Sequence, residues 1–198
     1  VANTTGATNV AVGYLSLSAN TTAADNTAVG AQSLQVNTVG ASNSAFGRYT
    51  LQNNTASNNT AVGKSALQEN TTGTQNTAIG ATALDACTTG NNNTVVGYGS
   101  AGVQITNSAV TAIGSEVLKV NTGNENTSIG AFSMGANTDG TQNTAVGVSA
   151  LAANTLGSKS VAIGYHALDE QNFTSATDAY NVAVGFDAGQ KVSTGVQN

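Results

Sequence analysis

The chain has no proline and no tryptophan, and only one cysteine and one histidine among its 198 residues. One cysteine excludes an internal disulfide framework. With Cys87 as the single thiol and His166 as the single imidazole, neither a catalytic triad nor a zinc site can be assembled within one chain. We therefore expect no enzymatic activity, and we predict no catalytic, cofactor-binding or metal-binding residues.

Charge is also scarce, because only 8% of the residues are charged and the formal net charge is −5. The few basic residues are scattered and form no patch that could follow a phosphate backbone, so nucleic acid is not an expected partner. No apolar run approaches the roughly 20 residues that a membrane-spanning helix needs, so this segment is not expected to insert into a membrane. The basic residues are Arg48, Lys64, Lys119, Lys159 and Lys191.

Asn, Thr, Ala and Gly dominate the sequence, and one glycine returns at a fixed interval. It closes a phrase of the type Asn-Thr-Ala-Val-Gly eleven times, and successive copies lie 16, 17 or, once, 21 residues apart. Such a period indicates units that bury their apolar surface only by stacking on their neighbours. The repeat glycines are Gly13, Gly30, Gly47, Gly63, Gly80, Gly97, Gly114, Gly130, Gly147, Gly164 and Gly185.

The residues before each glycine predict a short strand with an apolar column on both faces. The position directly before the glycine is always apolar, as in Val29, Val62, Ile79, Ile113 and Val146, and Thr stands two residues earlier in most copies. Ala alternates with these and therefore points to the opposite face, together with Asn. One face must line the inside of a coil, and the other needs a cover that a single thin coil cannot supply.

A second strand is expected from three residues after each glycine, on the surface of the coil. The fourth residue after the glycine is usually leucine, the fifth is often polar, and the sixth is often Ala or Val. This alternation suggests one face toward the interior and one face toward solvent. The strand ends in Asn-Thr before a turn, and the two 16-residue repeats lose their residue in that turn. Stacked Asn side chains are expected to bond to their copies in the next coil. The leucine column includes Leu34, Leu67, Leu84 and Leu151.

These patterns predict an all-β fold, a parallel β-solenoid of about eleven 17-residue turns with two short strands per turn. Residues 1–198 form a single continuous repeat domain, and residues 165–184 form an irregular repeat that carries a loop. The chain starts part-way through a repeat, and neither end resembles a cap, so we expect a segment of a longer fibre.

The phrase Asn-Thr-Ala-Val-Gly-x-x-Ala-Leu-x-x-Asn-Thr, at 59–71 and 143–155, resembles the head repeats of YadA-like trimeric autotransporter adhesins and similar repeats of bacteriophage tail fibres. The resemblance extends from Asn9 to about Gly189. It implies a left-handed parallel β-roll, three copies of which pack around one axis. That homotrimer would cover the second apolar face. The family's ligands do not carry over, because no binding motif matches residue by residue.

The expected function is therefore mechanical: an extracellular segment of a phage tail fibre or bacterial surface adhesin that spaces and attaches it to a cell-surface glycan or protein receptor. An alternative is ice binding through the Thr column, which Thr27, Thr60 and Thr77 illustrate. Regular Thr columns on flat β-solenoids are typical of ice-binding proteins. Val10, Ser44, Val161 and Val182 interrupt this column.

The 21-residue interval is the one irregularity that suggests a binding site. Loops that leave a solenoid often bear its binding surface. Acidic residues beside an aromatic ring can hold a sugar or a hard cation, although a tolerated surface insertion is the plainer interpretation. His166 is expected at a surface corner, and Cys87 as a small, semi-buried thiol in the Asn column. The candidate ligand contacts are Asp169, Glu170, Phe173, Asp178 and Tyr180.

Overall fold

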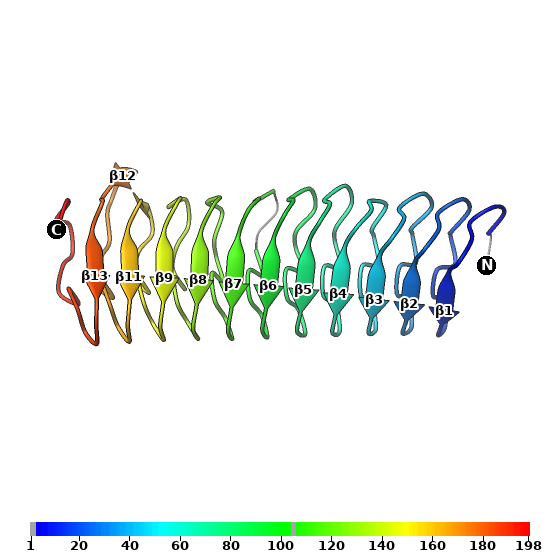
Figure 1. The fold of residues 1–198 in the computed structure, drawn as a ribbon, viewed down its shortest axis with the longest axis horizontal. Coiled ribbons are helices and arrows are strands. Elements are labelled where there is room, and N and C mark those ends of the chain that lie inside the picture. Colours follow the sequence, from blue (N-terminus) through cyan, green and yellow to red (C-terminus); the bar gives the residue numbers. More distant parts are fainter. Residues whose placement is uncertain (1–2, 104–105) are drawn as a thin grey trace.

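A computed structural model describes residues 3–103 and 106–198, which form one rod of stacked coils with a parallel sheet along one side (Figure 1). The sheet has eleven strands in the order β1-β2-β3-β4-β5-β6-β7-β8-β9-β11-β13, and β10 and β12 form a separate pair. The predicted all-β parallel β-solenoid with a 17-residue turn is confirmed. The strands are β1 (Val10–Val12), β2 (Thr27–Val29), β3 (Ser44–Phe46), β4 (Thr60–Val62), β5 (Thr77–Ile79), β6 (Thr94–Val96), β7 (Thr111–Ile113), β8 (Thr127–Ile129), β9 (Thr144–Val146), β10 (Gly157–Ser158), β11 (Val161–Ile163), β12 (Thr177–Asp178) and β13 (Val182–Val184).

Each strand of the main sheet has three residues, and in β2 to β9, β11 and β13 only the middle one is buried. Ala28, Ala45 and Ala61 are fully buried, whereas the first and third residues of their strands point outward. The inner face is therefore the Ala face, and the Val/Ile column with its Thr neighbours lies outside. A small inner side chain suits this position because the opposite wall of the coil, which carries the leucines, lies close by.

The leucine column fills the interior opposite the sheet, as expected. Leu34, Leu51, Leu67, Leu84 and Leu151 have no exposed surface, and Met134 takes the same position in its turn. Together with the inner Ala residues they form one continuous apolar cluster along the rod. Most coils thus contribute one large and one small apolar side chain to the core, which explains why so few long aliphatic residues suffice.

Buried asparagines join each coil to the next. The Asn43 backbone N–H donates to Asn26 Oδ1 at 3.0 Å, and the Asn59 backbone N–H donates to Asn43 Oδ1 at the same distance. The Asn43 side-chain N–H donates to the carbonyl of Ala56 at 2.8 Å. A second column, at the position seven residues after each repeat glycine, contains Asn154, which donates to Asn137 Oδ1 at 2.9 Å. These bonds satisfy amides that would otherwise be costly to bury, and they confirm the expected columns.

The repeat glycines make the corner that follows each strand. All eleven have φ between 126° and 139°, a conformation that L side chains rarely adopt. A Cβ built on Gly80 would lie 2.5 Å from the carbonyl oxygen of Gly97 in the next coil. Backbone conformation and the close approach of adjacent coils therefore both require glycine at this position.

The predicted second strand in each turn is wrong. The segment after each glycine is a succession of tight turns in which alternate residues are left-handed, as at Gln32 (φ 59°) and Leu34 (φ 49°). These residues are still held by neighbouring coils, because the Leu34 N–H donates to the Thr50 carbonyl at 3.0 Å. The sixth residue after the glycine also differs from expectation, because Val36 and Val120 are exposed and do not point inward.

The predicted place of the 16-residue deletions is confirmed. In a 17-residue coil the Asn37 side chain donates to the carbonyl three residues later, on Gly40, at 2.8 Å. In a 16-residue coil Asn54 donates to the carbonyl only two residues later, on Ala56, at 2.7 Å. The turn after the inner Asn absorbs the missing residue, so the strands on either side stay in register.

Candidate interaction surfaces

The outer face of the main sheet carries a continuous apolar stripe. It consists of the third residue of each of the eleven strands, and we call these residues the outer stripe. None of them is charged, seven are exposed and four are half-buried. Monomeric proteins rarely leave such a large contiguous apolar surface in water. Its members are Val12, Val29, Phe46, Val62, Ile79, Val96, Ile113, Ile129, Val146, Ile163 and Val184.

Threonines run parallel to the outer stripe on the same face. From β4 to β9 the first residue of every strand is Thr, and the strands pair so that Thr60, Thr77 and Thr94 lie side by side. Thr60 and Thr94 are exposed, and Thr77 is half-buried. The face is thus a regular array of hydroxyl and branched apolar groups.

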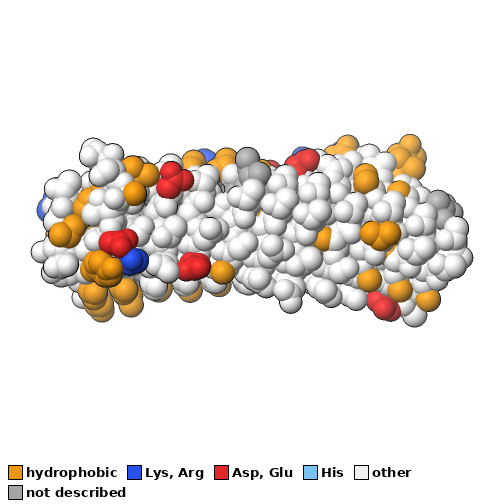
Figure 2. All heavy atoms as spheres, turned by 90° about the horizontal axis from the view of Figure 1, so that it is seen from above, with side chains coloured by type: hydrophobic (Ala, Val, Ile, Leu, Met, Phe, Trp, Pro, Cys, Tyr) orange, Lys and Arg blue, Asp and Glu red, His pale blue; other side chains and the backbone are white. Residues whose placement is uncertain are grey.

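The rest of the surface is mostly uncharged and polar. Figure 2 shows a few acidic and basic side chains scattered over a largely white surface, with hydrophobic side chains along one long edge of the C-terminal half. Within the described residues, no three His, Cys, Asp or Glu side chains form a group that could hold a metal ion. Nor does the described part of the chain contain a helix long and apolar enough to cross a membrane.

The residues of the 21-residue interval do not converge on one site. Asp169 lies 2.8 Å from His166 Nδ1, and Glu170 forms an ion pair with Lys191. Phe173 is only 6% exposed, so its ring serves as an anchor in the interior and not as a ligand platform. Asp169 and Glu170 are thus each paired with a basic side chain, and the ring of Phe173 is turned away from solvent.

Asp178 and Tyr180 do come together, and they meet a residue that the sequence analysis did not single out. Lys159 Nζ lies 2.6 Å from Asp178 Oδ2 and 3.2 Å from the Tyr180 hydroxyl. The partner was identifiable from the repeat, because Lys159 precedes Ser160 as Tyr180 precedes Asn181 one coil later. These hydrogen bonds to Asp178 and Tyr180 raise the pKa of the Lys159 ammonium.

Two further aromatic side chains stack at the corner after the repeat glycine. The rings of Tyr165 and Phe186 lie 5.1 Å apart with an interplanar angle of 13°, and the His166 ring lies 4.1 Å from Tyr165. Both rings occupy the first position after a repeat glycine, so the column position was a signal for this contact too. They extend the apolar surface of the outer stripe around the corner.

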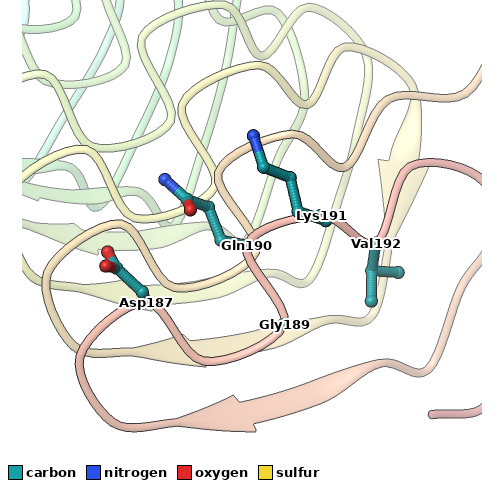
Figure 3. A pocket seen from close by; sticks show the side chains of 5 residues that line it. All are labelled: Asp187, Gly189, Gln190, Lys191 and Val192. Carbon is teal, nitrogen blue, oxygen red and sulfur yellow. The ribbon is translucent and has the colours of Figure 1, made fainter.

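A hollow of about 480 Å³ lies at the C-terminal end of the rod, lined by Asp187, Gly189, Gln190, Lys191 and Val192 (Figure 3). Gly189 stands at the position that other coils fill with Leu, Met or, once, alanine (Ala101), and a Cβ built on Gly189 would lie 2.9 Å from Leu168 Cδ2. Lys191, one of its few charged groups, is already paired with Glu170.

Cys87 is fully buried in the inner Asn column, more deeply than the semi-buried position expected. Its thiol points to the Gly90 carbonyl at 3.9 Å, and desolvation by burial raises its pKa. A buried thiol with a raised pKa is a poor nucleophile. His166 lies half-buried at the corner, where it bonds Asp169.

Comparison of the chain with protein-family models, with curated proteins and with solved structures gives no match in any of the three.

Proposed function

We propose that this chain is an extracellular segment of a homotrimeric fibre, of the phage tail-fibre or bacterial surface-adhesin kind, that spaces and attaches its particle or cell to a target surface. The observation that carries the proposal is the outer stripe. An interior face of Ala is already complete within one coil, so the exposed Val/Ile face has no structural role in a single copy. It acquires one when copies pack side by side.

The size of the stripe is sufficient for stable association. With strands about 4.8 Å apart, eleven strands extend over about 50 Å. Burying a half-exposed Val or Ile side chain contributes about 1 kcal/mol, so eleven contribute on the order of 10 kcal/mol per copy. That is comparable to the 4–15 kcal/mol or so that association costs in lost freedom, and neighbouring Thr and corner residues add further contact area.

The resemblance of the repeat to trimeric adhesin heads and tail-fibre repeats supports three copies in particular. The rod form supports a spacing role, because each coil contacts only its neighbours and length grows with repeat number. Scarce charge and the lack of convergent reactive groups in the described residues are in keeping with a mechanical role.

The mass in solution tests the proposal. Sedimentation equilibrium should give three times the 19.5 kDa of one chain. The double substitution Ile79→Glu and Val146→Glu places buried charge in the interface and should yield a folded monomer. Gln75→Glu, an exposed position on the same coil as Ile79 but off the stripe, should stay trimeric. A wild-type monomer at micromolar concentration would refute the fibre proposal.

Ice binding is the second candidate, and the partly exposed Thr column on the same face favours it. Six consecutive strands present Thr in register beside the outer stripe. The two functions need the same face, so one excludes the other. A monomer that inhibits ice recrystallisation, and loses that effect in Thr77→Glu, would favour ice binding; a trimer without the effect would exclude it.

A further inference from the structure

The insertion between β11 and β13 is anchored to neighbouring coils by buried contacts. Gln171 replaces Asn in the inner column, and its longer side chain reaches three partners: its amide N–H groups donate to Asn154 Oδ1 and Ser160 Oγ, each at 3.2 Å, and its carbonyl accepts from Asn181 Nδ2 at 2.8 Å. The side chain is fully buried. Gln171 thus links the two buried polar columns at the point where the insertion leaves the coil.

Two further contacts fix the inserted segment. Phe173 packs against Gly157, where a Cβ would lie 2.8 Å from its ring. The strand β12 then pairs in parallel with β10, with Gly157 opposite Thr177 and Ser158 opposite Asp178. The residues after the loop are consequently held in one position before the chain rejoins the main sheet.

This arrangement brings together the side chains of Lys159, Asp178 and Tyr180, which we call the insertion triad. Lys159 Nζ bonds both partners, and the Tyr180 hydroxyl lies 3.4 Å from Asp178 Oδ2. Tyr180 as a residue is 49% exposed, with Lys159 Nζ lying over its ring 5.2 Å from the centroid, and the Asp178 side chain is about half exposed. The ammonium and the carboxylate are 2.6 Å apart, so their charges largely cancel for a distant ligand.

The insertion triad retains hydrogen-bonding capacity next to an aromatic surface. Lys159 has a third N–H donor, and Asp178 Oδ1 has free acceptor positions. A donor and an acceptor side by side match two neighbouring hydroxyl groups, and an exposed tyrosine ring matches the C–H face of a pyranose. A paired ammonium and carboxylate favour neither an anion nor a cation. We propose that the insertion triad binds a neutral hexopyranose glycan.

The site is compatible with a fibre in which the outer stripe is covered. In Figure 1, β12 lies at the upper corner of the rod, apart from the strands of the main sheet. Association through the sheet face therefore leaves the triad accessible. The proposal identifies the partner class for the attachment role proposed above, and rests on it for its biological context, but binding is measured independently of mass.

The test measures retardation of the full chain by affinity electrophoresis in gels containing mannan, galactan or dextran, with polygalacturonate and polylysine as charged comparators. At least one neutral polysaccharide should retard the wild type. Tyr180→Ala should weaken that retardation about tenfold or more, whereas Tyr180→Phe, which keeps the ring, should retain part of it. Tyr98→Ala, which removes another exposed tyrosine (62% exposed), should bind as the wild type does.

Each other result overturns the proposal. It is overturned if no neutral polysaccharide retards the wild type, or if a charged polymer retards it more strongly than the neutral ones do. It is also overturned if Tyr180→Ala is retarded as strongly as the wild type. Unchanged thermal unfolding of each variant shows that the insertion is intact. A monomeric chain that still binds the neutral glycan would refute the fibre proposal and leave this one standing, and a trimer that does not bind would do the reverse.

Discussion

Cys87 occupies the place one coil after Asn70 in the inner Asn column, and Asn70 Oδ1 has no hydrogen-bond partner among the described residues. In several other coils the next asparagine donates to this atom, as Asn154 does to Asn137 and Asn70 does to Asn54. Asn20 Oδ1 also has no partner among the described residues, although an asparagine, Asn37, follows it in the column. A thiol is a weak donor and Cys87 points to the Gly90 carbonyl instead. The column is therefore interrupted at Cys87, and a fully buried amide oxygen is left unsatisfied.

Restoring the column should stabilise the chain. Cys87→Asn places an amide N–H group within reach of both Asn70 Oδ1 and the Gly90 carbonyl, and we expect a gain of about 1 kcal/mol in the free energy of unfolding. Cys87→Ala, which supplies no donor, is the matched control. Urea denaturation compares the three proteins, and a midpoint for Cys87→Asn no higher than that of the control would contradict the prediction.

The same thiol should make stability depend on pH. Burial raises the Cys87 pKa, so the native state holds its proton at a pH where the unfolded chain has lost it. Stability from this group is fully present below about pH 8.5, the ordinary thiol pKa, and falls as the pH rises above it. The free energies of unfolding of the wild type and of Cys87→Ala, measured from pH 7 to 10, should therefore diverge above that value, with the wild type losing more stability. Parallel dependence on pH in the two proteins would contradict the prediction.

A repeat glycine such as Gly80 should be irreplaceable, whereas a glycine with open space around it, such as Gly102, should not be. Gly80→Ala combines an unfavourable positive φ with a Cβ 2.5 Å from a backbone oxygen, so we expect a loss of more than about 3 kcal/mol. Gly102→Ala meets nothing closer than 3.6 Å and should change stability by less than about 1 kcal/mol. Thermal unfolding of both variants decides the matter, and a mild effect of Gly80→Ala would show that adjacent coils can separate.

Where a residue other than glycine has a left-handed backbone, substitution by glycine should stabilise the fold. Thr82 is β-branched and has φ 54°, and Gly99 occupies the equivalent position one coil later with φ 60°. Thr82→Gly should therefore stabilise the fold by about 0.5–1 kcal/mol, since relief of strain exceeds the added freedom of the unfolded chain. The reciprocal change Gly99→Thr should destabilise it, and equal signs for the two midpoint shifts would disprove the account.

Gln171 should be required for the insertion in particular. Gln171→Asn shortens the side chain by one methylene, so one amide cannot reach Asn154, Ser160 and Asn181 together, and we expect a loss of about 1–3 kcal/mol. Limited proteolysis should then cut first within 172–180. Asn137→Gln, the converse change in a coil without an insertion, controls for the effect of altering side-chain length in this column. If protease does not cut Gln171→Asn within the insertion, Gln171 does not anchor it.

The glycine interval and the strand before it were predictable because stacking requires the same residue at the same place in every coil. The leucine column and the turn that absorbs the deletions followed from the same rule. The second strand was wrongly predicted because Leu17, Leu34 and their equivalents have left-handed backbones, which alternate with ordinary ones and imitate the two-residue period of a strand. Bonds between coils, such as Gln32 N–H to the Tyr14 carbonyl at 2.8 Å, hold conformations that local preference disfavours.

The candidate ligand contacts were predictable only in part. Aromatic and acidic residues gather in the long interval, but their grouping depends on how the extra residues loop out. Pairing of β10 with β12 places Asp178 and Tyr180 beside Lys159, which lies 19 and 21 residues before them. Phe173 is turned inward by the same loop. The insertion's own residues give no signal for either outcome, because both are set by contacts between coils; only the repeat register, which aligns Lys159 with Tyr180, indicated the first of them.

The strands of the main sheet lie across the long axis of the rod, so its hydrogen bonds run along that axis. A force applied to the two ends therefore acts along these hydrogen bonds, so that coils separate one after another and not all at once. A coil of 17 residues lengthens by about 50 Å when it is drawn out straight. Under tension the molecule would therefore extend in steps of one coil each, nearly equal in length except at the 21-residue interval.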